Sequence, residues 1–252
     1  MNRLLVALAL PGSRTRIPPG EVERTLTGDE TLTSVQTSFG EGIAVVRKPA
    51  ATGRRSIIFL YGNAMTLADT PEIRATLTSR GNGLACPDYP GFGLSTGNAG
   101  EDGCYRAADA CLDLLGRAGI RPEEVVVAGW SLGSAVALEL ASRRAVNRLV
   151  LLSPLTGLAA AFLSMAGLGW LGQPSVGPFS GRRRARSVRC PSLLITGGAD
   201  TLTPPAMARE LSENLGGPTE MTVIPWADHL DLLDNDSVWR AVLDFANNKE
   251  LQ

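Results

Sequence analysis

Val125-Val126-Val127-Ala128-Gly129-Trp130-Ser131-Leu132-Gly133 is the stretch that decides the fold class of this chain. Its first four residues are apolar and mostly β-branched, which predicts a buried strand, and the residues from Leu132 onward have the apolar spacing of a helix. Because Gly129 and Gly133 lack side chains, the strand and the helix can approach each other closely. The stretch therefore predicts a sharp strand-to-helix turn with Ser131 at its tip.

The same alternation of short apolar runs and longer amphipathic stretches continues over the chain from Arg55 onward. Parallel strands joined by crossover helices produce this pattern, so we predict an α/β fold with a mostly parallel central sheet and helices on both faces. The predicted strands are Ser56 to Tyr61, Leu84 to Asp88, Val125 to Trp130, Arg148 to Ser153, Ser192 to Gly197 and Met221 to Pro225, preceded by an antiparallel strand at Ile43 to Arg47. The predicted helices are Asp69 to Arg80, Tyr105 to Ala118, Leu132 to Arg144, Pro204 to Leu215 and Ser237 to Asn247.

Composition and charge are those of an ordinary globular protein. The 252 residues are 44% hydrophobic and 19% charged with a formal net charge of −1, which gives no electrostatic case for nucleic acid binding. No charge run or Ser/Gly tract divides the chain, so we expect an N-terminal segment over residues 1–40 and a single domain over residues 41–252. The arginine cluster at residues 182–189 is predicted to be a solvated face, with an anionic-substrate or membrane-surface patch as the alternative.

The cysteine spacing bears on metal sites and disulfides, and the N-terminal residues bear on membrane association and secretion. Four cysteines follow neither a CxxC nor a Cys/His metal spacing and the chain has one histidine, so we expect no metal site and no disulfide from Cys86, Cys104, Cys111 and Cys190. The apolar run from Leu4 to Leu10 is too short to span a bilayer. We expect an ordered N-terminal segment and a cytoplasmic protein, with membrane association or secretion as the alternative.

Two stretches match the pattern Gly-x-Ser-x-Gly, and their flanking residues distinguish them. A nucleophilic serine needs a strained turn between a buried strand and a helix, so that its hydroxyl is exposed and the helix N-terminus faces a developing oxyanion. Ser131 has both flanks. Ser95, in Gly93-Leu94-Ser95-Thr96-Gly97, has loop residues on both sides, so we predict that it is structural.

A serine hydroxyl needs a neighbouring base, and His229 is the only histidine that could provide it. His229 follows the last predicted strand, where a loop at the carboxyl edge of the sheet can reach the serine. The acid that orients the imidazole is predicted to be Asp200, which ends a predicted strand and a Gly-rich turn and gives the chain order Ser, Asp, His. Asp228 is the rival, although its position next to His229 makes contact with Nδ1 difficult.

The oxyanion of an acyl-transfer intermediate needs two N–H donors. One is expected from the backbone of Leu132, directly after the nucleophile. The other is expected from the turn after the strand Ser56 to Tyr61, where Asn63 or Ala64 would present its backbone N–H. A plain strand-exit turn is the alternative interpretation.

With these residues in place, the chain resembles the α/β-hydrolase superfamily from about residue 40 to the C-terminus, most closely the compact group that includes the BEM46-like and ABHD17-like hydrolases. Asp88 to Gly97 is similar to that group's loop before the first long helix, Gly129 to Gly133 to its nucleophile elbow, and Asp200 to Pro204 to its acid turn. The resemblance implies an α/β-hydrolase fold with no large cap domain. Such proteins usually carry His-Gly where this chain has Tyr61-Gly62, so the bracing of the oxyanion turn is expected to differ.

The expected activity is hydrolysis of a small-molecule ester or thioester through an acyl-enzyme, with Ser131, His229 and Asp200 as the triad and no cofactor. A non-catalytic binding protein on the same fold, a peptidase and a cofactor-free haloperoxidase remain alternatives. Residues 154–189 are too long for an ordinary loop, so we expect a helical excursion over the substrate entrance, or else a core helix. The residues expected to contact the substrate are Tyr61, Trp130, Phe162, Met165 and Trp170.

Overall fold

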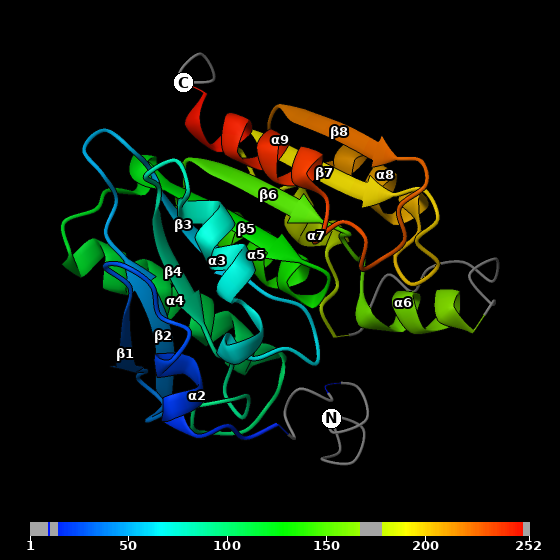
Figure 1. The fold of residues 1–252 in the computed structure, drawn as a ribbon. Helices are drawn as coiled ribbons and strands as arrows, with labels where there is room; N and C mark the ends of the chain where they lie inside the picture. The colour runs from blue at the N-terminus through cyan, green and yellow to red at the C-terminus, as the bar shows by residue number, and fades with distance from the viewer. Residues whose placement is uncertain (1–9, 11–14, 167–177, 249–252) are drawn as a thin grey trace. The chain divides into compact units, whose positions relative to one another are not determined.

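The computed structural model describes residues 10, 15–166 and 178–248, which form two compact units, Met1–Val125 and Val126–Gln252 (Figure 1). The single domain expected over residues 41–252 stays a prediction. Apart from Leu10, which is buried, the apolar run Leu4 to Leu10 lies outside the described residues. No helix in the described part of the chain is long and apolar enough to cross a membrane.

The first unit is a four-stranded sheet with helices on both faces. Its strands lie in the order β1 (Thr31–Gln36), β2 (Gly42–Lys48), β4 (Gly83–Pro87) and β3 (Ser56–Leu60). β1–β2 and β2–β4 pair antiparallel, and β3–β4 pairs parallel. Its helices are α2 (Pro19–Glu23), α3 (Pro71–Thr78) and α4 (Glu101–Arg117), with short 3-10 turns η2 (Leu67–Asp69) and η3 (Pro122–Glu124). In Figure 1, α3 lies in front of this sheet and α4 behind it.

Strand β1 lies inside the expected N-terminal segment and was not predicted from the sequence. Its residues Thr-Leu-Thr-Ser-Val-Gln are mostly polar, and only Val35 is buried, because β1 is an edge strand. The chain before it is held by a buried ion pair between Arg74 Nη1 of α3 and Glu30 Oε2 at 2.7 Å, and by a hydrogen bond from Arg74 Nη2 to Thr25 Oγ1 at 2.7 Å. These long-range contacts, which no local pattern reveals, order the segment.

The second unit is a parallel sheet in the order β5 (Val125–Trp130), β6 (Arg148–Leu152), β7 (Ser192–Gly197) and β8 (Thr219–Ile224). Its helices are α5 (Leu132–Arg143), α6 (Leu158–Met165), α7 (Arg182–Ala185), α8 (Pro205–Asn214) and α9 (Asp236–Asn247). In Figure 1, α9 lies in front of the sheet and α8 behind it. Because the strands are parallel, the loops that follow all four strands meet at one edge of the sheet.

The predicted strands and helices from Ile43 to Asn247 agree with the structure within a few residues at each end. The central strands form the core: all five residues of β3, β4 and β6 and all six of β5 are buried, as the Val- and Leu-rich runs predicted. Arg148, at the start of β6, is fully buried and donates to the carbonyls of Ala246 at 3.2 Å and Asn248 at 2.6 Å. It satisfies carbonyls at the C-terminal end of α9, where a cation is favoured.

The predicted excursion, residues 154–189, contains the helices α6 and α7, and residues 167–177 between them lie outside the described residues. The arginine cluster is engaged with its own unit: Arg182 pairs with Glu210, and Arg184 Nη1 donates to the carbonyl of Ser180 at 2.9 Å. The four cysteines are free; Cys86, Cys104 and Cys111 are buried, and burial raises the pKa of the Cys86 thiol to about 12. Among the described residues no cluster of three or more His, Cys, Asp or Glu side chains is arranged to hold a metal.

Candidate active site

Ser131 lies on a strained turn between β5 and α5. Its φ of 53° and ψ of −119° are unusual for a residue with a side chain, and its N–H donates to the carbonyl of Leu152 on β6 at 2.9 Å. A Cβ at Gly129 would lie 2.1 Å from the carbonyl oxygen of Gly133, so only glycine permits this approach of strand to helix. The hydroxyl of Ser134 donates to the Ser131 carbonyl at 2.6 Å and holds the turn from the helix side.

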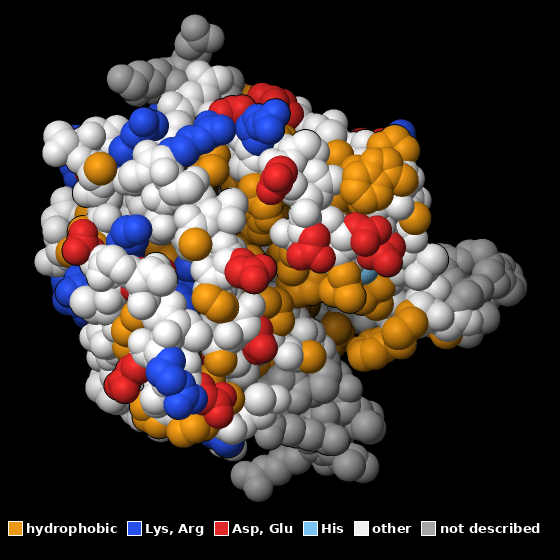
Figure 2. Space-filling model, viewed as in Figure 1, with side chains coloured by type: hydrophobic (Ala, Val, Ile, Leu, Met, Phe, Trp, Pro, Cys, Tyr) orange, Lys and Arg blue, Asp and Glu red, His pale blue; other side chains and the backbone are white. Residues whose placement is uncertain are grey.

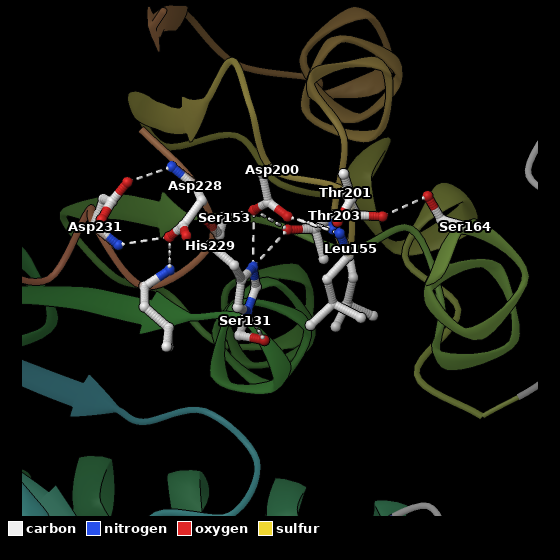
Figure 3. A network of polar contacts seen from close by, with 12 residues as sticks. Ser131, Ser153, Leu155, Ser164, Asp200, Thr201, Thr203, Asp228, His229 and Asp231 are labelled. Atoms are coloured by element: carbon white, nitrogen blue, oxygen red, sulfur yellow. Dashed lines mark hydrogen bonds and ion pairs between the residues drawn. The ribbon is translucent and has the colours of Figure 1, made fainter. Parts of the chain in front are cut away.

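The histidine ring joins Ser131 to Asp200 (Figure 3). His229 Nε2 lies 2.9 Å from Ser131 Oγ, and His229 Nδ1 lies 2.8 Å from Asp200 Oδ2. With the proton on Nδ1, the imidazole donates to the carboxylate and accepts from the serine hydroxyl. His229 is 98 positions from Ser131 and 29 positions from Asp200 in sequence, and the three residues come from three loops at the same sheet edge.

Two glycines let the histidine loop, residues 225–236, approach the acid turn, residues 197–204. A Cβ at Gly197 would lie 2.3 Å from the carbonyl oxygen of Ala227, and one at Gly198 would lie 2.4 Å from that of Pro225. The close approach allows two backbone hydrogen bonds: Gly198 N–H donates to the carbonyl of Ile224 at 2.8 Å, and Ala199 N–H donates to the carbonyl of Ala227 at 3.0 Å. The Gly-rich turn thus fixes the distance between Asp200 and His229.

Asp228, the rival acid, has a different set of contacts. Its Oδ1 accepts the N–H groups of Leu230 at 2.8 Å and Asp231 at 3.0 Å, and its own N–H donates to Asp231 Oδ2 at 2.8 Å. These bonds form an Asx-type turn that shapes the loop on the C-terminal side of His229. The carboxylate that contacts the imidazole is therefore that of Asp200, and Asp228 supports the loop that carries the ring (Figure 3).

The Asp200 carboxylate is buried and hydrogen-bonded on both oxygens. Oδ1 accepts the N–H groups of Leu202 at 2.9 Å and Thr203 at 2.7 Å. Burial acts to raise the pKa of Asp200, but the hydrogen bond and charge of His229 and the N–H and O–H groups of Thr203 outweigh it, so the pKa lies below its usual value. Asp200 is thereby held as an anion able to orient the imidazole.

Two hydroxyl groups at this carboxylate were missed by the sequence reasoning. Thr203 Oγ1 donates to Asp200 Oδ2 at 2.8 Å and lies 3.2 Å from His229 Nδ1, while Ser153 Oγ donates to the same Oδ2 at 3.0 Å. Thr203 could have been noticed, since a hydroxyl three residues after an aspartate often bonds back to it. Ser153 has no local signal, because only the pairing of β6 with β7 brings it to Asp200.

The predicted substrate residues of the second unit differ in exposure. Trp130 is 5% exposed; its ring lies 5.2 Å from that of His229, and its indole nitrogen has no hydrogen-bond partner among the described residues. On α6, Phe162 is 42% and Met165 is 62% exposed. Ser164 Oγ donates to the carbonyl of Thr201 at 2.9 Å, which ties α6 to the acid turn. Trp170 lies outside the described residues.

Tyr61 does not have an exposed side chain, which corrects the expectation that it would contact substrate. The ring is fully buried, and its hydroxyl donates to Asp88 Oδ1 at 2.7 Å. The hydroxyl of Tyr89 in turn donates to the carbonyl of Tyr61 at 2.9 Å. Burial, followed by the nearby charge of Asp88, raises the pKa of Tyr61 well above its usual value, so the phenol stays a donor. Tyr61 braces the strand exit from within the core of its unit.

The two candidate oxyanion donors of the first unit lie on the turn after β3. Ala64 has a φ of 66°, and its N–H donates to Asn63 Oδ1 at 3.0 Å. The Asn63 side chain would have to turn away before Ala64 could donate to a substrate, and the oxyanion role of both residues stays a prediction. Ser95, by contrast, is buried; its hydroxyl donates to the carbonyl of Asp88 at 2.7 Å and accepts the N–H of Ala44 at 2.9 Å, as its loop flanks predicted for a structural serine.

Comparison with known proteins agrees with this architecture. Residues 66–228 match the model of the "Alpha/beta hydrolase family". An uncharacterised protein of Mycobacterium tuberculosis is 31% identical over 199 residues, which cover 75% of this chain and 69% of that protein. Alpha/beta hydrolase domain-containing protein 17B of Homo sapiens is 35% identical over 131 residues, 50% of this chain and 46% of that protein.

Solved structures share the fold at low sequence identity. An esterase of Pyrococcus furiosus superposes with a TM-score of 0.76 at 18% identity, covering 92% of this chain and 94% of the esterase. An alpha-beta hydrolase of Vibrio vulnificus superposes with a TM-score of 0.73 at 20% identity, covering 97% and 91%. The strand order, the turn at Ser131, the family match and these superpositions lead to one conclusion: the chain belongs to the α/β-hydrolase family.

Proposed function

We propose that this α/β-hydrolase is a serine hydrolase that cleaves a carboxylic ester or thioester through an acyl-enzyme, with Ser131 as nucleophile, His229 as general base and Asp200 as the orienting acid. The observation that carries the proposal is the unbroken pair of contacts from Ser131 Oγ to His229 Nε2 at 2.9 Å and from His229 Nδ1 to Asp200 Oδ2 at 2.8 Å. A hydroxyl, an imidazole and a buried carboxylate in this order are the groups that acyl transfer requires.

In the first step, Ser131 Oγ forms a bond to the substrate carbonyl carbon while its proton moves to His229 Nε2. The carbonyl π electrons move onto the oxygen and then return, which breaks the bond to the alcohol or thiol, and the leaving group takes the proton from Nε2. In the second step, water attacks the acyl-serine, gives its proton to Nε2, and releases the carboxylic acid as Ser131 regains its proton. Asp200 remains ionised and stabilises the imidazolium formed in each step.

The negative oxygen of the intermediate needs donors that are already in place. Leu132 is the first residue of α5, so its N–H has no partner within the helix, and the helix dipole adds partial positive charge there. The proposed second donor is the backbone N–H of Asn63 or Ala64. The positive φ of Ser131 supports this arrangement, because it turns the nucleophile away from the strand at the start of the helix.

The proposal is tested by Ser131→Ala with p-nitrophenyl acetate and butyrate as substrates. Loss of the nucleophile is expected to lower kcat by about 10⁴-fold or more, because the remaining groups cannot form an acyl-enzyme. Ser142→Ala is the matched control, since Ser142 lies on the same helix and its hydroxyl donates to the carbonyl of Glu139 in its own helix. Wild-type protein is also expected to be labelled by a fluorophosphonate, and Ser131→Ala is not.

A non-catalytic binding protein is the second candidate. The buried Tyr61, at the position where the resembling hydrolases usually carry histidine, favours it, because the oxyanion turn is braced differently. Purified wild-type protein that neither hydrolyses short activated esters nor reacts with a fluorophosphonate, while remaining folded, would support this second candidate and remove the first.

A further inference from the structure

The segments that surround the triad in the second unit carry negative charge only. These four segments are residues 129–138, 153–166, 197–208 and 225–236. They contain Asp200, Asp228, Asp231, Asp234 and Asp236, and they contain no lysine or arginine. Asp200 is buried and hydrogen-bonded to His229, so within these four segments the exposed charge comes from the histidine loop. In that loop Asp228 is exposed and Asp231 is half-buried, and hydrogen bonds within the loop join the two residues directly before and after His229 and Leu230 (Figure 3).

Apolar side chains alternate with these acids. Trp226 and Leu230, on either side of Asp228 and His229, are 66% and 62% exposed. Across the acid turn, α6 has no ionisable residue and presents Phe162 and Met165 to solvent. Figure 2 shows apolar surface close to red carboxylates around the pale-blue edge of the histidine. A monomer seldom leaves large apolar side chains clustered around a polar site without a ligand to cover them.

The contacts of α6 make this apolar surface part of the same site. The Ser164–Thr201 hydrogen bond fixes α6 one residue from Asp200, and Trp226 and Leu230 belong to the loop whose backbone bonds to the acid turn. The exposed apolar side chains therefore belong to two segments that are both hydrogen-bonded to the acid turn. Each methylene that such a surface removes from water strengthens binding by up to roughly fourfold.

From the charge and the apolar surface together we infer the substrate class, an inference that rests on the serine hydrolase proposed above. The site prefers an apolar acyl chain joined to a cationic leaving group. It accepts a neutral leaving group less well and discriminates against an anionic leaving group. Asp228 and Asp231 select the charge of the leaving group, and Phe162 and Met165 bind the acyl chain. Carboxylates on the loop that carries the general base attract a cation and repel an anion through the same field, which raises or lowers the rate of productive encounter.

Charge selection is tested with three thioesters that share one octanoyl group: octanoyl thiocholine, octanoyl thioglycerol and octanoyl thioglycolate, with released thiol measured by Ellman's reagent. At about 0.02 M NaCl, wild-type kcat/KM is expected to be at least about fivefold higher for the cationic than for the anionic thioester. At about 0.5 M NaCl the ratio is expected to fall below about twofold, because salt screens exposed charges. The ratio is the readout, so a uniform change in activity does not affect it.

The double variant Asp228→Asn, Asp231→Asn removes both charges while the amide oxygens can still accept the N–H groups of the Asx-type turn. It is expected to bring the low-salt ratio close to the high-salt value. Glu213→Gln, at an exposed position near the C-terminal end of α8, is the matched control and is expected to keep the wild-type ratio. Phe162→Ser with Met165→Ser is expected to lower the preference for octanoyl over acetyl thiocholine by about tenfold.

The outcomes separate this inference from the function beneath it. One outcome is that octanoyl thioglycerol is hydrolysed in a Ser131-dependent reaction, while the kcat/KM values for the cationic and anionic thioesters lie within about twofold of each other at low salt. This outcome overturns the charge selection and leaves the serine hydrolase intact. A ratio that the Asp228, Asp231 double variant does not change overturns the assignment to these two residues. Wild-type protein that hydrolyses p-nitrophenyl butyrate but none of the three thioesters overturns this inference alone. Wild-type protein that hydrolyses neither the thioesters nor p-nitrophenyl butyrate and does not react with a fluorophosphonate removes the proposed function as well.

Discussion

Two hydroxyl groups compete with the imidazole for one oxygen of Asp200. Three donors lie within 3.0 Å of Asp200 Oδ2: Ser153 Oγ, Thr203 Oγ1 and His229 Nδ1. A carboxylate oxygen has only two lone pairs, so the three donors share them. The hydroxyls hold the carboxylate in the plane that faces the histidine, since Asp200 has no other side-chain donor in the described residues. In the proposed mechanism these hydroxyls therefore act through Asp200 and His229, as positioning groups.

Thr203→Val removes the hydroxyl but keeps the shape of the side chain. We expect kcat/KM for p-nitrophenyl butyrate to fall by about tenfold with KM little changed, because the acid and the base lose their mutual alignment. Thr203→Ser keeps the hydroxyl and is expected to restore most of the activity. Wild-type activity in the valine variant together with a loss in the serine variant would mean that packing of the methyl group, and not the hydroxyl, is what matters at this position.

The element that positions the histidine is the Gly197-Gly198 turn between β7 and α8. Both glycines contact the backbone of the histidine loop, where a Cβ would meet carbonyl oxygens at 2.3 Å and 2.4 Å. A backbone carbonyl cannot move aside as a flexible side chain does, so any side chain here displaces one loop relative to the other. The turn is thus the element on which the Asp200–His229 distance depends.

Gly198→Ala is expected to lower kcat/KM by about 10- to 100-fold, because a displacement of about 1 Å between base and acid is enough for such a loss. Gly116→Ala is the matched control, since a Cβ there meets nothing within 4 Å and alanine favours the α4 helix. Steady-state kinetics with p-nitrophenyl butyrate and thermal unfolding of both variants check the prediction. Wild-type activity in Gly198→Ala would show that the loop tolerates the shift.

At the scale of the whole molecule, the Asp200 carboxylate also links folding to pH. The pKa of Asp200 is lower in the folded protein than its ordinary value of 3.8, so the folded state binds fewer protons than the unfolded state as pH falls toward that range. The stabilisation from the ionised carboxylate is fully present well above 3.8 and is lost as pH falls through the lower folded value. Acid therefore weakens the interaction that holds the loops of Asp200 and His229 together.

Asp200→Asn should lower the free energy of unfolding relative to wild type, and this difference is expected to stay constant from about pH 7 to about pH 5 and to shrink below about pH 4. Urea unfolding at a series of pH values measures it. Glu213→Gln is the control, because it shows how the free energy of unfolding changes when an exposed carboxylate of the same unit is removed. A difference between wild type and Asp200→Asn that grows as the pH falls would contradict the sign derived from the depressed pKa.

The strand and helix positions could be predicted because they depend on short-range patterns. The strand predicted at Val125 to Trp130 is confirmed over the same residues, and the helix predicted at Leu132 to Arg144 ends one residue earlier in the structure, at Arg143. The edge strand Thr31–Gln36 could not be predicted, because a segment of such polar composition depends on long-range contacts such as the pairing with β2 and the Arg74–Glu30 ion pair before it. Similarly, the burial of Tyr61 depends on Asp88, which is 27 residues away.

The amino-acid sequence by itself determined the α/β class, the tight turn at Ser131 and the identity of the one available histidine, because each follows from local composition or from elimination. Tertiary structure alone decided which carboxylate contacts that histidine and which hydroxyls support it. Ser153 and Asp200 are 47 residues apart, and they meet because β6 and β7 pair in parallel with a fixed register. Such contacts depend on strand order and loop closure, which are properties of the folded chain as a whole and leave no periodic trace in any one segment.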